Sequence, residues 1–271
     1  MFLQVGQHTI HYECYGNGPI LLCCLPGYGE TGKDFEPLAR ELGLYYTVIC
    51  PDLPLHGQTN WLADKFEIPD LHQVLQALVA KEGFSGQAMA LAGYSMGGRL
   101  ALAYAQEFPK MLNQLILLAP DGLHQNFWYR ISTQTKAGNY LFRTTMQNPG
   151  WLFWLMKWAR KLNLLNESIV KFSHRYLDDP LQRKSLYERW TLYRNFSPAL
   201  PALQKIIQAQ PLPALLVFGR FDRIIPPMRS KKITSGSPKN IRVLILEAGH
   251  RLLKPQFAAT IASAITSTGK V

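Results

Sequence analysis

The five residues Gly93-Tyr94-Ser95-Met96-Gly97 stand between an apolar run over residues 88–92 and a helix-like pattern over 99–108. The apolar run predicts a buried strand, so the five residues lie on a sharp turn from strand to helix. Such a turn places the Ser95 hydroxyl above the edge of the sheet. The crowded backbone leaves room only for glycine at positions 93 and 97. The amide groups at the start of the helix favour an anion that forms next to this serine. The pattern therefore indicates a nucleophilic serine at the edge of a sheet.

A serine hydroxyl is a weak nucleophile until a base takes its proton, and the base needs an acid that orients it. Of seven histidines, His250 stands out because it leaves a predicted buried strand over residues 241–246. Asp222 lies three residues after another predicted strand, 214–219. The order Ser95, Asp222, His250 is typical of a serine on a strand-to-helix turn. Asp121, which follows a predicted strand over 115–119, is the alternative acid.

Five segments of the chain together resemble the motifs of α/β-hydrolases. They are residues 25–29 (Leu-Pro-Gly-Tyr-Gly), 51–57 (Pro-Asp-Leu-Pro-Leu-His-Gly), 93–97, 218–222 (Phe-Gly-Arg-Phe-Asp) and 248–250 (Ala-Gly-His). The family usually has His-Gly where this chain has Pro26-Gly27, and Gly-His-Gly at residues 55–57. The resemblance implies an α/β fold in which helices cover both faces of a mostly parallel central sheet.

The same resemblance implies a function for the serine turn. It implies a triad of Ser95, Asp222 and His250, and an oxyanion hole formed by the backbone amides of Tyr28 and Met96. The expected reaction is hydrolysis of a carboxylic ester or thioester with an apolar acyl group, through an acyl-enzyme on Ser95. No dissociable cofactor is expected. In similar folds the same triad also cleaves carbon-carbon bonds or eliminates a leaving group from acidic cofactor-pathway intermediates, which Arg99, Arg130, Arg143 or Arg194 could bind.

The apolar runs outside this turn predict the rest of the sheet. A hairpin is expected over residues 2–15, and strands near 19–25, 46–50, 88–92, 114–119, 213–218 and 241–246. Helical patterns lie near 33–43, 69–82, 97–107, 227–234 and 252–266. Strands that alternate with helices indicate a parallel sheet covered on both faces. Residues 124–212 have no strand signal, so we expect a core of 1–123 and 213–271 and a helical lid over 124–212.

The expected lid differs from the core in composition. It holds 15 of the 31 aromatic residues and five of the six tryptophans, and its 13 Lys and Arg residues outnumber four Asp and Glu. Trp151, Trp154 and Trp158 fall on one helical stripe. This stripe can pack on the body of the protein, or it can form, with Trp128, the apolar wall of a substrate pocket. Weak contact with an anionic membrane surface is a third interpretation, because basic and aromatic residues alternate there.

Other classes of function find less support. Residues 27–32 match a dinucleotide fingerprint, with Asp52 twenty positions later as a ribose-binding acid, but a nucleotide site leaves Ser95, Asp222 and His250 unexplained. A non-catalytic ligand-binding module of the same fold is a further alternative. No motif indicates a metal or a nucleic-acid partner. Four cysteines lie in apolar strands and the N-terminus does not resemble a signal peptide, so a cytoplasmic location is expected. The sequence does not indicate an oligomeric state.

Overall fold

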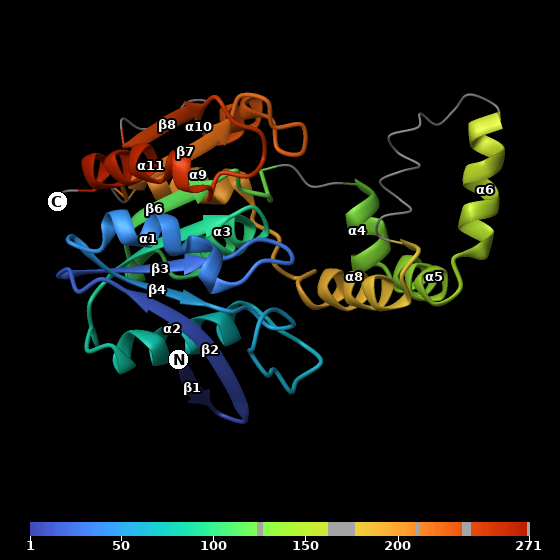
Figure 1. Ribbon diagram of the computed structural model, residues 1–271, viewed down its shortest axis with the longest axis horizontal. Coiled ribbons are helices and arrows are strands. Elements are labelled where there is room, and N and C mark those ends of the chain that lie inside the picture. Colours follow the sequence, from blue (N-terminus) through green and yellow to red (C-terminus); the bar gives the residue numbers. More distant parts are fainter. Residues whose placement is uncertain (124–126, 162–176, 210–211, 235–239, 270–271) are drawn as a thin grey trace. The chain divides into compact units, whose positions relative to one another are not determined.

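The computed structural model describes residues 1–123, 127–161, 177–209, 212–234 and 240–269 (Figure 1). Eight strands form one sheet in the order β1-β2-β4-β3-β5-β6-β7-β8. Their bounds are β1 Phe2–Val5, β2 His8–Tyr15, β3 Ile20–Leu25, β4 Tyr46–Pro51, β5 Met89–Tyr94, β6 Leu112–Leu118, β7 Ala214–Gly219 and β8 Ile241–Leu246. The first two strands pair antiparallel, as does β2 with β4, and all pairs from β4 to β8 are parallel. The predicted α/β fold with a mostly parallel sheet is confirmed.

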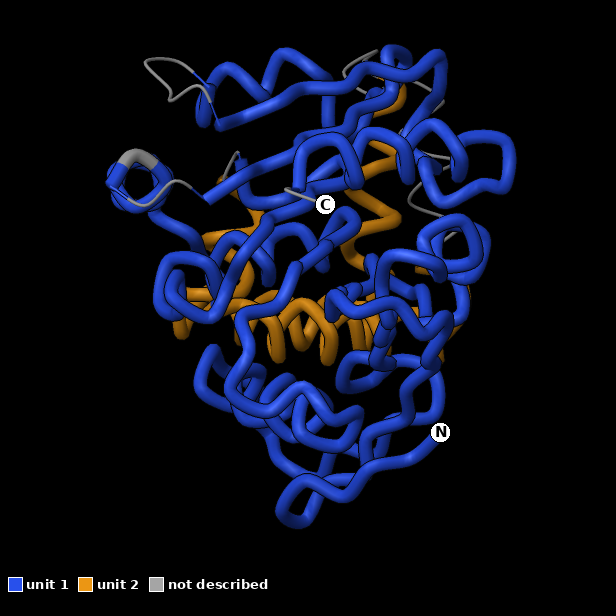
Figure 2. The backbone as a smooth tube through the Cα atoms, turned by 90° about the vertical axis from the view of Figure 1, so that its left-hand side faces the viewer, with its two compact units in different colours: residues 1–124, 196–271 blue, residues 125–195 orange. Residues whose placement is uncertain are grey.

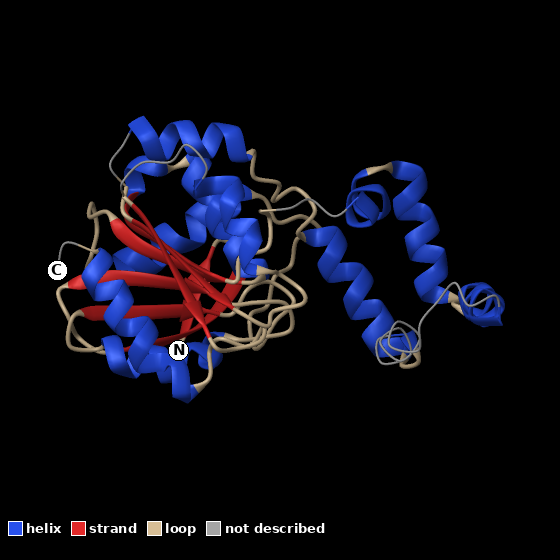
Figure 3. Cartoon of the chain, turned by 90° about the horizontal axis from the view of Figure 1, so that it is seen from above, coloured by secondary structure: helices blue, strands red, loops and turns tan. Residues whose placement is uncertain are grey.

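The central strands are apolar along their whole length because helices cover both of their faces. Every residue of β4, β5 and β7 is buried. Helices α1 (Glu36–Leu42) and α11 (Pro255–Thr268) contact each other and share one core with alternate residues of the strands. On the other face, α3 (Met96–Glu107) contacts β3, β5 and β6 and packs beside α2 (Ile68–Lys81). Figure 3 shows helices on both sides of the sheet.

Shorter elements complete the core. They are the 3-10 turns Gly32–Phe35, Pro109–Met111 and Pro227–Ser230 and the helices α9 (Leu200–Ala209) and α10 (Lys231–Thr234). Because β3 to β8 are parallel, their carboxyl ends meet at one edge of the sheet, which is where a ligand site forms in this architecture. Ser95, Asp222 and His250 all follow strands at this edge. Across the described ranges, no helix is both long and apolar enough to cross a membrane.

The chain divides into two compact units, coloured separately in Figure 2. The first comprises residues 1–124 and 196–271, and the second residues 125–195. The second unit contains α4 (Phe127–Gln134), α5 (Lys136–Gln147), α6 (Gly150–Lys161) and α8 (Pro180–Leu192). Within it, Trp190 packs against Tyr129 and Phe142, and the Tyr187 hydroxyl donates to Asn139. Residues 162–176 of the expected lid lie outside the described residues.

The second unit is shorter than the expected lid over 124–212. Residues 196–212, which include α9, group with the first unit instead. Leu203 and Ile207 of α9 are fully buried, and α9 contacts α3. The Phe196 ring packs against Phe66 with 5.4 Å between the centroids. The apolar residues of this segment thus serve the core of the first unit, which a search for strand signals alone does not reveal.

Candidate active site

Ser95 occupies a tight turn between β5 and α3. Its φ is +50°, a left-handed conformation that costs free energy for a residue with a side chain and is characteristic of functional turns. A Cβ atom on Gly93 would lie 2.3 Å from the Gly97 carbonyl oxygen, and one on Gly97 would lie 2.0 Å from the Leu25 carbonyl oxygen. Both positions therefore require glycine, and the close approach of Gly97 places the start of α3 against the end of β3.

The structure brings Ser95, His250 and Asp222 together, although they lie far apart in the sequence. His250 Nδ1 is 2.7 Å from Asp222 Oδ2, and His250 Nε2 is 3.1 Å from Ser95 Oγ. A carboxylate only accepts hydrogen bonds, so Nδ1 carries the proton in this arrangement and Nε2 accepts from the serine hydroxyl. The imidazole is thus placed to take the proton of Ser95.

Asp222 is buried and held by several donors. Its Oδ1 accepts hydrogen bonds from the amides of Ile224 and Ile225, both at 2.8 Å. Burial by itself raises the pKa of Asp222, but the hydrogen bonds from His250 and these two amides outweigh it and hold the pKa below its ordinary value. The residue therefore stays negatively charged beside the imidazole, which stabilises the imidazolium form.

Asp121 faces a different partner. Its amide donates to the Ser95 carbonyl oxygen at 2.8 Å, so its backbone lies next to the serine turn. Its carboxyl group, however, accepts from the Gly122 amide and lies 3.6 Å from the guanidinium of the buried Arg99. Of the two candidate acids, the structure places only Asp222 against His250. Arg99, a candidate for binding acidic substrates, is paired with Asp121 instead.

Tyr94 supports His250 from the end of β5. Its hydroxyl donates to the His250 carbonyl oxygen at 3.0 Å, and the two rings pack with 5.5 Å between centroids. Tyr94 is buried, so this hydrogen bond is shielded from water. The loop that carries His250 is therefore tied to the strand that precedes Ser95.

The two expected oxyanion donors lie at the start of α3 and in the loop after β3. Met96 is the first residue of α3, where an amide has no partner within the helix. Tyr28 lies in the loop after β3, and its ring packs edge-to-face on His56 at 6.3 Å. The approach of Gly97 to the carbonyl oxygens of Leu25 and Pro26 brings these two segments together beside Ser95.

Comparison with known proteins shows the family of the chain. The sequence pattern of the alpha/beta hydrolase fold matches residues 20–254. This chain belongs to the α/β-hydrolase fold family. Uncharacterized hydrolase YugF of Bacillus subtilis (strain 168) is 24% identical over 247 residues, 89% of this chain and 88% of that protein. A pimeloyl-(acyl-carrier protein) methyl ester esterase of Xanthomonas oryzae pv. oryzae is 25% identical over 89% of this chain and 91% of that enzyme.

Solved structures show the same fold. A thermophilic esterase from Thermogutta terrifontis superimposes with a TM-score of 0.67 at 19% identity, over 96% of this chain and 92% of that one. Together the matches support a hydrolase of the α/β-hydrolase fold. Among the described residues of this α/β-hydrolase, no group of three or more His, Cys, Asp or Glu residues is arranged to hold a metal ion.

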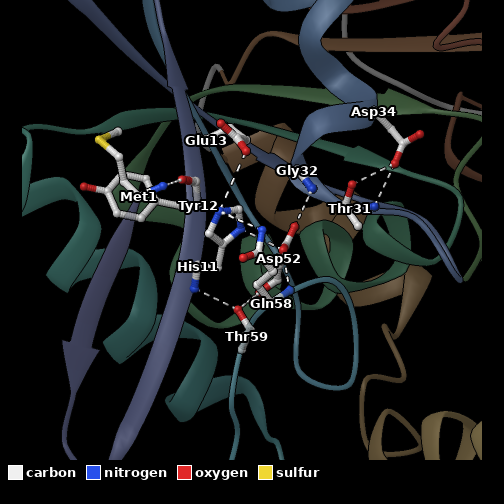
Figure 4. Close-up of polar contacts among 10 residues, drawn as sticks. All are labelled: Met1, His11, Tyr12, Glu13, Thr31, Gly32, Asp34, Asp52, Gln58 and Thr59. Carbon is white, nitrogen blue, oxygen red and sulfur yellow. Dashed lines mark hydrogen bonds and ion pairs between the residues drawn. The ribbon is translucent and has the colours of Figure 1, made fainter.

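Asp52, the candidate ribose-binding acid, is the centre of a buried network in this α/β-hydrolase (Figure 4). Its Oδ1 accepts from the Gly32 amide at 2.8 Å, and its Oδ2 accepts from the Gln58 amide at 2.9 Å and lies 2.8 Å from His11 Nδ1. These contacts tie the loop after β3 to the loop after β4 and to β2. Both oxygens of this carboxyl group already bind groups of the protein, which argues against a dinucleotide site.

The tryptophans expected in substrate binding lie in the second unit and are exposed. They are Trp128 on α4 and Trp151, Trp154 and Trp158 on α6. Trp154 and Trp158 pack together with 5.9 Å between centroids, and the Lys161 ammonium lies 5.5 Å from the Trp158 ring. In this unit α6 buries Met156 and leaves its aromatic stripe outward.

Glu30 lies near the candidate site, and the sequence patterns did not single it out. It lies in the loop after β3, and its carboxyl group accepts a hydrogen bond from the Gly27 amide at 3.1 Å. The signal in the sequence is an acid within the glycine-rich stretch of residues 27–32. A carboxylate beside the expected oxyanion hole repels the negative charge that forms there, so this position is unfavourable unless another interaction compensates for it.

Proposed function

We propose that this α/β-hydrolase cleaves a carboxylic ester or thioester with an apolar acyl group, through an acyl-enzyme on Ser95. The observation that carries the proposal is the continuous chain of contacts from Ser95 Oγ through His250 to Asp222, at 3.1 Å and 2.7 Å. At the first distance an imidazole can accept the proton of an attacking hydroxyl, and at the second a carboxylate orients the imidazole by a hydrogen bond.

In the proposed acylation step, Ser95 Oγ attacks the carbonyl carbon while His250 Nε2 takes the hydroxyl proton. The carbonyl oxygen becomes an oxyanion, which the amides of Met96 and Tyr28 stabilise. The imidazolium then gives its proton to the departing alcohol or thiol as the carbon-oxygen or carbon-sulfur bond breaks. A water molecule, deprotonated by His250, attacks the acyl-enzyme in the same manner and releases the acid and the free serine.

The acyl specificity is inferred from the second unit. Trp128, Trp151, Trp154 and Trp158 offer aromatic surface for an apolar chain, and the basic residues of 124–212 favour an acidic group on the substrate. The name of the Xanthomonas relative, an esterase for a methyl ester on an acyl chain, agrees with this substrate class. The same stripe with Lys157, Arg160 and Lys161 also suits weak contact with an anionic membrane surface.

The proposal is tested with p-nitrophenyl esters of graded acyl length, assayed on the wild type and Ser95→Ala. We expect turnover that depends on acyl length in the wild type and a loss of at least about 10³-fold in kcat for Ser95→Ala, because this variant lacks the proposed nucleophile. A fluorophosphonate probe should label the wild type alone.

Different outcomes separate the alternatives. Labelling of Ser95 without turnover of any ester would favour cleavage of carbon-carbon bonds or elimination by the same triad. Neither labelling nor turnover, in a protein with a normal thermal unfolding transition, would favour a non-catalytic binding module. Equal turnover by Ser95→Ala would contradict the acyl-enzyme.

A further inference from the structure

Glu30 and Gly27 form the two ends of a turn next to the proposed oxyanion hole. The Glu30 amide donates to the Gly27 carbonyl oxygen at 3.2 Å, and Glu30 Oε2 accepts from the Gly27 amide at 3.1 Å. Tyr28, the expected oxyanion donor, lies between these two residues. The two hydrogen bonds in opposite directions fix both ends of the turn, so they restrict the orientation of the Tyr28 amide.

The carboxyl group of Glu30 also lies near the ring of Tyr94, the residue before Ser95. A Cβ atom on Gly27 would lie 2.7 Å from Glu30 Oε2 and 3.1 Å from the Tyr94 ring, so these groups surround the same position. Tyr94 in turn holds the His250 carbonyl oxygen. Glu30 thus lies in the same loop as Tyr28 and next to Tyr94, whose hydroxyl binds the His250 backbone.

Four ionisable groups interact electrostatically with this carboxyl group. They are Asp34 of the following 3-10 turn, Tyr94 of β5, and His250 and Arg251 of the loop after β8. The two positive partners, His250 when protonated and Arg251, attract the ionised carboxylate, while Asp34 repels it. By the same Coulomb interaction, an ionised Glu30 favours the imidazolium that His250 becomes when it takes the Ser95 proton.

We propose that Glu30 is a positioning residue for the reaction on Ser95: its carboxyl group holds the turn that presents the Tyr28 amide, and its charge favours protonated His250. The inference rests on the proposed function. In this proposal the ionised carboxylate disfavours the oxyanion but favours the imidazolium, so the two electrostatic effects offset each other.

Burial, followed by repulsion from Asp34, raises the pKa of Glu30 to about 7, although the Gly27 amide, His250 and Arg251 act in the opposite direction. Glu30 therefore changes its charge near neutral pH. The acid limb of the pH profile should then report the ionisation of Glu30.

The test compares Glu30→Gln and Glu30→Ala with the wild type and with a matched control, Glu41→Gln, which removes the same charge from an exposed position on α1. Each protein is assayed for kcat/KM between pH 5 and 9 and for the rate of fluorophosphonate labelling over the same range. Thermal unfolding checks that each variant is folded.

Glutamine keeps an oxygen that can accept from Gly27 but carries no charge. For Glu30→Gln we expect the acid limb to move toward lower pH, because no carboxyl group ionises at this position. Its kcat above pH 8 should fall on the order of threefold. Glu30→Ala also frees the turn, so a further loss of about tenfold in kcat is expected, with little change in KM. Glu41→Gln should match the wild type.

The proposal is overturned if Glu30→Gln has the pH profile of the wild type, or if Glu41→Gln shifts it by the same amount. Equal rates for folded Glu30→Ala and Glu30→Gln would contradict the role in holding the turn. Failure of the proposed function looks different: the wild type itself is then not labelled at Ser95, and the inference about Glu30 falls with it.

Discussion

Two carboxyl groups near His250 sit in environments that move their pKa values in opposite directions. Asp222 accepts hydrogen bonds from two amides and the imidazole, which lower its pKa, whereas burial and Asp34 raise that of Glu30. Environments of this kind assign different tasks to groups of the same chemistry. In the proposed mechanism Asp222 stays ionised and orients the base, while Glu30 changes its charge near neutral pH.

Replacing Asp222 with asparagine tests its task. The asparagine can donate its NH₂ group to His250 Nδ1, which favours the tautomer that carries the proton on Nε2. Because Nε2 then cannot accept the Ser95 proton, kcat should fall by about 10⁴-fold. The measurement is kcat/KM of Asp222→Asn on the ester with the highest wild-type turnover. Asp121→Asn is the matched control, because that carboxyl group faces Arg99 and Gly122. A larger loss for Asp121→Asn than for Asp222→Asn would contradict the assignment.

Among the elements around the site, the loops after β3 and β4 depend on one another. Asp52, directly after β4, accepts hydrogen bonds from the Gly32 amide at the end of the loop after β3 and from the Gln58 amide in its own loop. His11 of β2 completes the contact, and the Thr59 hydroxyl donates to the Asp52 carbonyl oxygen at 2.7 Å. The loop after β3 is thus held by Glu30 within its turn and by Asp52 at its end.

Asp52→Asn should weaken both loops. An asparagine presents one oxygen and one NH₂ group, so the NH₂ must face either the Gly32 or the Gln58 amide and leave that buried donor unpaired. We expect the free energy of unfolding in urea to fall by about 2 kcal/mol. Asp64→Asn, at an exposed position, provides the control and should change stability by less than about 0.5 kcal/mol. An unchanged midpoint for Asp52→Asn would show that the network contributes no net stability.

Over the full chain, charge is distributed unevenly along the sequence. Residues 1–123 carry a net charge of −6, whereas residues 124–212 and 213–271 carry +9 and +8. The two basic segments account for the overall charge of +11. A field of this sign raises the local concentration of anionic ligands and speeds their association.

This distribution predicts that ionic strength affects acidic substrates selectively. Between about 20 and 300 mM NaCl, kcat/KM for an ester with a free carboxylate should fall by about threefold or more, because the Debye length shortens from about 20 Å to 6 Å. The neutral ester of the same acyl length serves as the control and should change little. Parallel behaviour of the two esters would contradict electrostatic attraction of the substrate.

Local patterns in the amino-acid sequence suffice to predict the sheet, the serine turn and the order of Ser95, Asp222 and His250. Apolar runs of strand length and glycines around a serine are local signals, and parallel strands bring their carboxyl ends to one edge whatever the details of packing. The strands lie within a few residues of their expected bounds for this reason. The helical nature of residues 127–161 could also be predicted, but the division of the chain near residue 196 could not.

Tertiary packing was needed to tell which acid faces His250 and what Asp52 and Glu30 contact. Asp121 and Asp222 follow neighbouring parallel strands, so spacing cannot separate them, and the difference lies in where each side chain points. The partners of Asp52 are 20 residues away at Gly32 and 41 away at His11. Contacts over such separations depend on packing in three dimensions, which the sequence encodes only through the complete fold.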